Sequence, residues 1–163
     1  MSSDDDIFFS GGAVEDVAEW MARTLGLERL ESPDLEEGEY LFKKQSRFTD
    51  GLGVLLLVRP NIHLVVDPEP DEVSVIDGCT GMAKVRLAGV KDVQAQTREA
   101  CTIFSELAAT APRVALVLTN ALSTVVAAYR PGAGVRSFPA GTSMDLDDIG
   151  VWRPWVGGGP HGG

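Results

Sequence analysis

The stretch VKDVQAQTREACTIFSELAATAPRVALVLTNALSTVVAAYR, residues 90–130, decides the fold. Apolar side chains between residues 90 and 111 recur mostly every three or four positions, which predicts one long amphipathic helix. The apolar face carries Val93, Ala100, Cys101, Phe104, Leu107, Ala108 and Ala111. The opposite face is predicted to carry Lys91, Gln94, Arg98, Glu99 and Glu106. Pro112 follows and ends the helix, because proline has no backbone donor and clashes with the preceding turn.

Two runs rich in β-branched residues come next. RVALVLT (residues 113–119) and STVVAAY (residues 123–129) predict two strands around a turn at Asn120-Ala121. A long helix cannot bury its apolar face on so short a hairpin. The rest of the chain must therefore supply a wider sheet.

The first half of the chain predicts a second helix and several strands. DIFFS (residues 6–10) is a short strand, and residues 13–25 form a helix that Gly26 ends. Residues 28–39 (ERLESPDLEEGE) form an exposed acidic loop with an edge strand at its start, and residues 40–46 resemble a further edge strand. Residues 52–58 are apolar at consecutive positions, which is typical of a central strand covered on both faces.

Further strands are predicted at residues 62–66, 73–76, 82–87 and 135–138, with an acidic loop at residues 67–72. The aromatic segment VWRPWV (residues 151–156) is expected to fold back on the core rather than to contact a partner. Residues 1–156 form one α+β domain, with an antiparallel sheet of about six to eight strands and two helices packed on one face. Residues 157–163, GGGPHGG, form a flexible glycine-rich tail.

The charge of the chain limits its partners. Lys and Arg number 14 against 24 Asp and Glu, a formal net charge of −10. This excess disfavours nucleic acid and anionic membranes as partners. The start, MSSDDDIFF, lacks the basic and apolar regions of a secretory signal, and no apolar run reaches the roughly 20 residues of a membrane span, so we expect a cytoplasmic protein.

The sequence offers few groups for catalysis or metal binding. His63 and His161 are the only histidines, and Cys79 with His63 is the only conceivable thiol and base pair. The acids at positions 67–77 lack the spacing of a calcium loop, and no phosphate-binding glycine motif is present. We expect no metal, no cofactor and no enzymatic activity.

Two acidic segments, residues 31–39 and 145–148, have two possible roles. Acidic surfaces keep many proteins soluble, whereas an acidic face can also attract a basic protein partner. The candidate partner-binding residues are Glu31, Asp34, Glu36, Glu37, Glu39, Asp145, Asp147 and Asp148.

Two passages resemble a known family. GLGVLLLV (residues 51–58) and CTIFSELAATAPRVALVLTNALSTVVAAYRPGAG (residues 101–134) resemble SitI3-type immunity proteins, the cognate inhibitors of bacterial polymorphic toxins. The resemblance spans residues 51–138, and the short DIFFS strand and the VWRPW tail depart from the family pattern. It implies a protein that binds and neutralises a toxin domain by occluding its active site.

Two other functions remain open from the sequence. A small acidic secretion chaperone for an effector protein is also α+β, and such a chaperone usually dimerises. A helix-grip domain would bind a small ligand in an apolar cavity lined by Phe104, Leu107 and strand residues. A stable dimer would favour the chaperone, and a large closed pocket would favour the ligand-binding domain.

Overall fold

The computed structural model describes residues 4–49, 53–63, 69–89 and 92–156. The predicted glycine-rich tail lies outside these residues. The elements in chain order are β1 (Asp5–Ser10), α1 (Val14–Leu25), β2 (Glu28–Leu30), β3 (Tyr40–Gln45), β4 (Gly53–Pro60), η1 (Pro70–Glu72), β5 (Gly81–Leu87), α2 (Val93–Ala109), β6 (Ala115–Asn120), β7 (Thr124–Arg130), β8 (Gly134–Ser137), η2 (Leu146–Asp148), α3 (Ile149–Trp152) and η3 (Arg153–Trp155).

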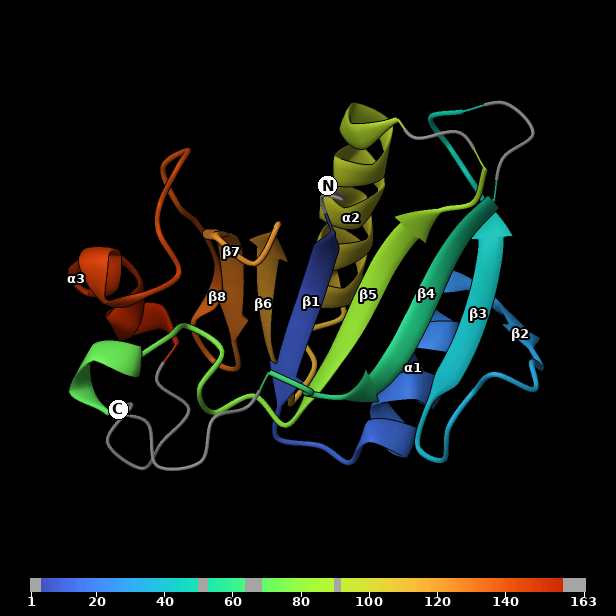
Figure 1. Ribbon diagram of the computed structural model, residues 1–163, viewed down its shortest axis with the longest axis horizontal. Coiled ribbons are helices and arrows are strands. Elements are labelled where there is room, and N and C mark those ends of the chain that lie inside the picture. Colours follow the sequence, from blue (N-terminus) through green and yellow to red (C-terminus); the bar gives the residue numbers. More distant parts are fainter. Residues whose placement is uncertain (1–3, 50–52, 64–68, 90–91, 157–163) are drawn as a thin grey trace.

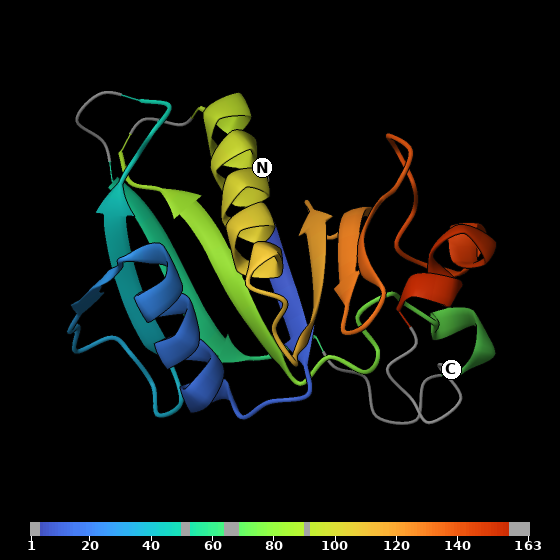
Figure 2. The same cartoon turned by 180° about the vertical axis from the view of Figure 1, so that it is seen from behind.

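The strands form one eight-stranded antiparallel sheet in the order β2-β3-β4-β5-β1-β6-β7-β8. Helices α1 and α2 lie across one face, in front of the sheet in Figure 2 and behind it in Figure 1. The predicted class, an α+β fold with both long helices on one face, is confirmed. The described part of the chain contains no helix long and apolar enough to cross a membrane.

Helix α2 confirms the long predicted helix with shorter bounds. The Asp92 carboxylate accepts a hydrogen bond from the Ala95 amide at 3.0 Å and so caps the start. Three predictions about its faces are wrong. Val93 and Ala111, predicted on the apolar face, are exposed, and Glu99, predicted on the polar face, is fully buried. Lys91, also predicted on the polar face, lies outside the described residues. Glu99 is buried because its carboxylate accepts hydrogen bonds from the Ser46 hydroxyl and the Arg47 amide, which joins the segment after β3 to the helix.

Several strand predictions are also corrected. Ile62 and His63 form a turn, and the rest of the predicted strand at residues 62–66 lies outside the described residues. Residues 73–76 form only an isolated bridge, from Ser74 to Asp145. Strand β3 is not an edge strand, because β2 pairs with its outer side. The other predicted strands and the β6–β7 hairpin are present.

Strand β1 is central, because it pairs with both β5 and β6. The aromatic ring of Phe9 lies directly over Gly81 of β5, where an added Cβ would stand 2.2 Å from a ring carbon. Only glycine fits at this position without displacing the ring. The DIFFS run therefore supplies the centre of the sheet, although the sequence presents it as a short, isolated strand.

Two apolar clusters lie on opposite faces of the sheet. The larger cluster fills the space between the sheet and the two helices. The smaller cluster lies on the other face, where Phe8, Met82 and Val117 of the sheet contact Val75, Cys79, Met144 and Trp152. Trp152 is buried there, which confirms that the aromatic C-terminal segment folds back on the core. This second cluster covers only part of the face, at β1, β6, β7 and the start of β5.

Candidate functional site

The first predicted acidic segment forms the loop between β2 and β3. Glu31, Asp34, Glu36 and Glu37 are exposed in this loop. Glu31 lies 3.5 Å from Arg29, and the other three side chains make no ion pair with a described residue. Glu39 differs from them, because its carboxylate accepts the Glu36 amide and pairs with Arg59 at 3.2 Å. Glu39 therefore holds the loop, and the other four carboxylates face solvent.

The second predicted segment has mostly a structural role. Asp145 caps η2 by accepting a hydrogen bond from the Asp147 amide at 3.0 Å. Asp148 accepts a hydrogen bond from the Ser143 amide, and the backbone oxygen of Asp145 accepts one from the Trp152 indole. Asp147 is exposed. These bonds fix the turn that carries Trp152 into the second apolar cluster.

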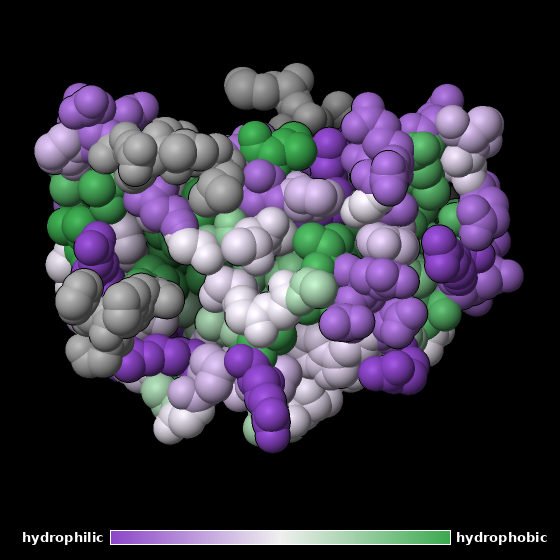
Figure 3. Space-filling model, turned by 90° about the horizontal axis from the view of Figure 1, so that it is seen from below, coloured by the Kyte–Doolittle hydropathy of each residue, from purple (hydrophilic) through white to green (hydrophobic). Residues whose placement is uncertain are grey.

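The structure does not bring the two acidic segments together. The β2–β3 loop lies at one end of the eight-stranded sheet, and residues 145–148 lie beyond the opposite end (Figure 1). With about 4.8 Å between neighbouring strands, the two segments are roughly 30 Å apart. Hydrophilic residues gather towards the β2–β3 end in the view from below (Figure 3). A single small cleft on a partner cannot contact both segments.

A third surface was missed by the sequence reasoning. In β4 the side chains of Val54, Leu56 and Val58 belong to the helix-side core. Leu55 and Leu57 alternate with them, point to the other face and are partly exposed. The prediction that this strand is covered on both faces is wrong for the described residues, and Figure 1 shows this part of the sheet with no helix in front of it.

The strand register places more leucines beside these two. Leu30 pairs with Leu41 of β3, and Leu41 pairs with Leu57 of β4. Directly paired residues of antiparallel strands share a face, so the three side chains form a row across β2, β3 and β4. All three are partly exposed. We refer to Leu30, Leu41, Leu55 and Leu57 as the leucine face.

Charged residues border the leucine face. Leu55 lies in register between Lys43 of β3 and Arg86 of β5, whose side chains are 50% and 55% exposed. Lys43 pairs with Glu28 at 3.5 Å. Lys84 and Arg86 share one carboxylate, that of Asp4, at 3.3 and 3.5 Å. The apolar centre is thus bordered by two exposed cations, and the acidic loop begins where β2 ends.

A buried carboxyl lies farther along the same face. Asp6 of β1 pairs in register with Lys84 and with Thr119 of β6. Asp6 is 1% exposed, and among the described residues neither its carboxylate oxygens nor the Thr119 hydroxyl has a hydrogen-bond partner. Burial raises the pKa of Asp6 to about 6, against the opposing effect of the Lys84 charge. An unpaired buried carboxylate destabilises the folded chain at neutral pH.

The thiols and the histidine do not form a nucleophilic site. Burial raises the pKa of Cys79 to about 12, so this thiol stays protonated. Burial also raises the pKa of Cys101 and lowers that of His63. The His63 ring lies edge-on to Phe8 at 6.4 Å, which is a packing contact. Within the described residues, no group of three or more His, Cys, Asp or Glu side chains is placed to hold a metal.

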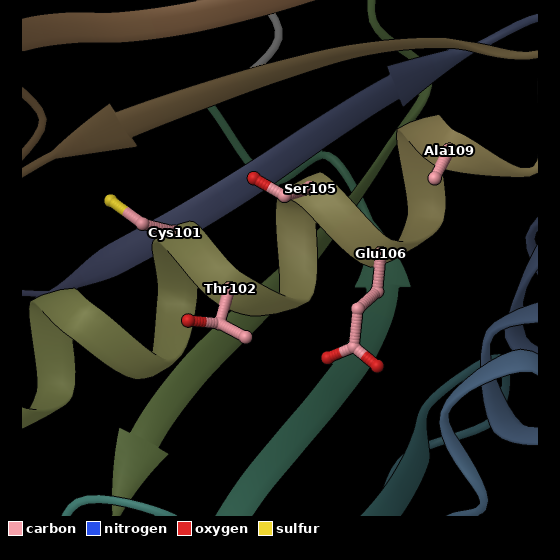
Figure 4. Close-up of a pocket in the computed structure, with 5 residues that line it drawn as sticks. All are labelled: Cys101, Thr102, Ser105, Glu106 and Ala109. Carbon is pink, nitrogen blue, oxygen red and sulfur yellow. The ribbon is translucent and has the colours of Figure 1, made fainter.

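Helix α2 has a shallow depression of about 370 Å³ on its outer side. It is lined by Cys101, Thr102, Ser105, Glu106 and Ala109, and Figure 4 shows that these side chains leave one helix in different directions. Glu106 pairs with Arg47. The depression therefore presents no convergent set of polar groups for a ligand.

The structure lends no support to a helix-grip cavity at the predicted position. Phe104 and Leu107 are buried within the core between α2 and the sheet. They contact strand side chains directly, as in an ordinary packed interior.

A comparison of the chain with protein-family models, with curated proteins and with solved structures finds no match.

Proposed function

We propose that this protein is an immunity protein, which binds a cognate bacterial toxin domain and neutralises it by occluding its active site. The observation that carries the proposal is the β2–β3 loop, where Asp34, Glu36 and Glu37 are exposed and pair with no described cation. The resemblance of residues 51–138 to SitI3-type immunity proteins supplies the class of partner.

The loop suits a toxin with a basic substrate-binding cleft, such as that of a nuclease. Uncompensated carboxylates on a chain of net charge −10 create a negative potential that accelerates encounter with a basic surface. The protein then acts by blocking the cleft and performs no chemistry itself. Because exposed charges are screened by salt, the complex should form more slowly and bind more weakly at high ionic strength.

The test takes a candidate toxin domain from the product of a neighbouring gene and measures whether this protein binds and inhibits it. The variant D34N/E36Q/E37Q removes three charges from the loop. The matched control E15Q/D16N/E19Q removes three exposed charges from α1, at the helix-covered face. We expect the loop variant to lower the association rate about tenfold at low salt and the control to change it less than about twofold. Equal effects of the two variants would contradict a local contact.

A secretion chaperone remains the second candidate, because a partly exposed apolar sheet face could also hold an extended effector segment. Light scattering of the chain alone separates the two functions. A monomer that inhibits the toxin domain supports the immunity protein. A stable dimer that protects an effector segment and leaves the toxin active supports the chaperone.

A further inference from the structure

The two halves of the non-helical sheet face differ in their cover. On β1, β6 and β7 the apolar side chains are covered by Val75, Met144, Trp152 and their neighbours. On β2, β3 and β4 no described segment contributes to such a cluster, and the four leucines of the leucine face are partly exposed. Covering the exposed part of adjacent apolar side chains is favourable by about 25 cal/mol per Å², and contiguous apolar patches mark interaction sites.

We infer that the leucine face is the principal contact surface for the toxin domain, an inference that rests on the proposed function. The face has the arrangement of a protein interface, with an apolar centre and a charged border. The chain runs from Leu30 of the face directly into Glu31 of the acidic loop. The acidic loop therefore leaves the sheet at the β2 edge of the leucine face, and its exposed carboxylates lie next to that edge.

The charges define the partner that this surface fits. At the β2 side the adjoining loop carries the exposed side chains of Glu31, Asp34, Glu36 and Glu37. At the β5 side the border carries Arg86, which is 55% exposed and shares the Asp4 carboxylate with Lys84. Asp6, beyond Lys84, is too deeply buried to meet a partner. The complementary surface is apolar at its centre, basic where it meets the loop, and acidic where it meets Arg86.

The first variant places a charge at the centre of the leucine face. Leu57→Lys should weaken binding of the toxin domain about 30-fold or more, as expected for a central apolar contact. Val135→Lys is the control, because Val135 is an apolar strand residue, 52% exposed, in β8 at the opposite end of the sheet. The control should change the dissociation constant less than about threefold. Thermal unfolding of each variant shows whether it is folded, and Leu57→Ala replaces Leu57→Lys where the lysine prevents folding.

The second variant tests the positive charge at the β5 side of the leucine face. Arg86→Glu should weaken binding about tenfold, because it opposes the acidic part of the partner. Arg23→Glu makes the same change of charge on α1 and should have little effect. Substitutions at Leu57 should act mainly on the dissociation rate, whereas those in the acidic loop should act on the association rate.

The outcomes separate this inference from the proposed function. Tight binding by wild type that Leu57→Lys leaves unchanged overturns the leucine face as the contact surface and leaves the immunity function standing. A wild-type chain that neither binds nor inhibits the toxin domain refutes the function, and the inference with it. A dimer of the chain alone that Leu57→Lys dissociates assigns the face to a second copy and also overturns the inference.

Discussion

The two faces of β4 have nearly the same composition and very different surroundings. Val54, Leu56 and Val58 are at most 1% exposed beneath the helices, whereas Leu55 and Leu57 of the same strand are partly exposed. A continuous apolar run therefore shows that both faces of a strand are apolar. It does not show whether the second face is covered by the same chain or by another molecule.

The largest expected effect is a difference in the free energy of unfolding between substitutions on the two faces of β4. Leu56→Ala should lower the free energy of unfolding by about 2–5 kcal/mol, because it leaves a cavity in the helix-side core. Leu57→Ala should lower it by about 1 kcal/mol or less, because solvent already reaches that side chain. Chemical denaturation of both variants measures the difference. Equal losses would mean that the leucine face is covered in the isolated protein.

Helix α2 offers the same contrast between two glutamates. Glu99→Ala should cost about 2–4 kcal/mol of stability, because the Ser46 hydroxyl and the Arg47 amide lose a buried acceptor. Glu106→Ala removes an ion pair with the same Arg47, but the Glu106 side chain is 40% exposed. This substitution should therefore cost less than about 1 kcal/mol of stability. Denaturation midpoints of the two variants test this order, and a larger loss at Glu106 would contradict it.

These residues also show which features of the structure can be predicted from the sequence. Periodicity predicts α1, α2 and the β6–β7 hairpin, because local patterns determine helix and strand type. It places Glu99 on the wrong face, because the acceptor role of that side chain depends on Ser46, which is distant in the chain. The apolar run of β4 also predicts that Leu57 is buried. The run gives no information on the strand order, which decides whether another part of the chain covers that face. The acidic loop could be predicted from composition, and the leucine face could be found only from the strand register.

The buried carboxyl of Asp6 tests the same sheet face by pH. Its pKa is raised from 3.8 to about 6, so the folded chain retains a proton that the unfolded chain releases between these values. The stability that this proton contributes is fully present below about pH 4 and is lost as the pH rises through about 6. Asp6→Asn should therefore stabilise the protein by about 1–3 kcal/mol at pH 7.5 and hardly at pH 4.

Measurement of unfolding free energies for wild type and Asp6→Asn at both pH values checks the sign. Asp5→Asn is the contrasting variant, because Asp5 accepts hydrogen bonds from Gln96 and Asn120 on the helix side. Burial raises the pKa of Asp5 as well, but its carboxylate has these donors, so Asp5→Asn should stabilise the protein less than Asp6→Asn does at pH 7.5. A gain from Asp6→Asn that is equal at both pH values would show that ionisation of Asp6 is not the cause.

The smallest expected effect compares the two acidic segments. Asp145→Ala should cost about 1 kcal/mol of stability, because η2 loses the side chain that accepts the Asp147 amide. Glu37→Ala should stay within about 0.5 kcal/mol of wild type, because that side chain is exposed and makes no ion pair with a described residue. Binding of the toxin domain should show the opposite order, with the larger loss at Glu37. A carboxylate that the fold does not use is free to contact a partner, so a larger loss of binding at Asp145 than at Glu37 would move the contact surface to the C-terminal segment. A larger loss of stability at Glu37 would contradict the structural role of Asp145.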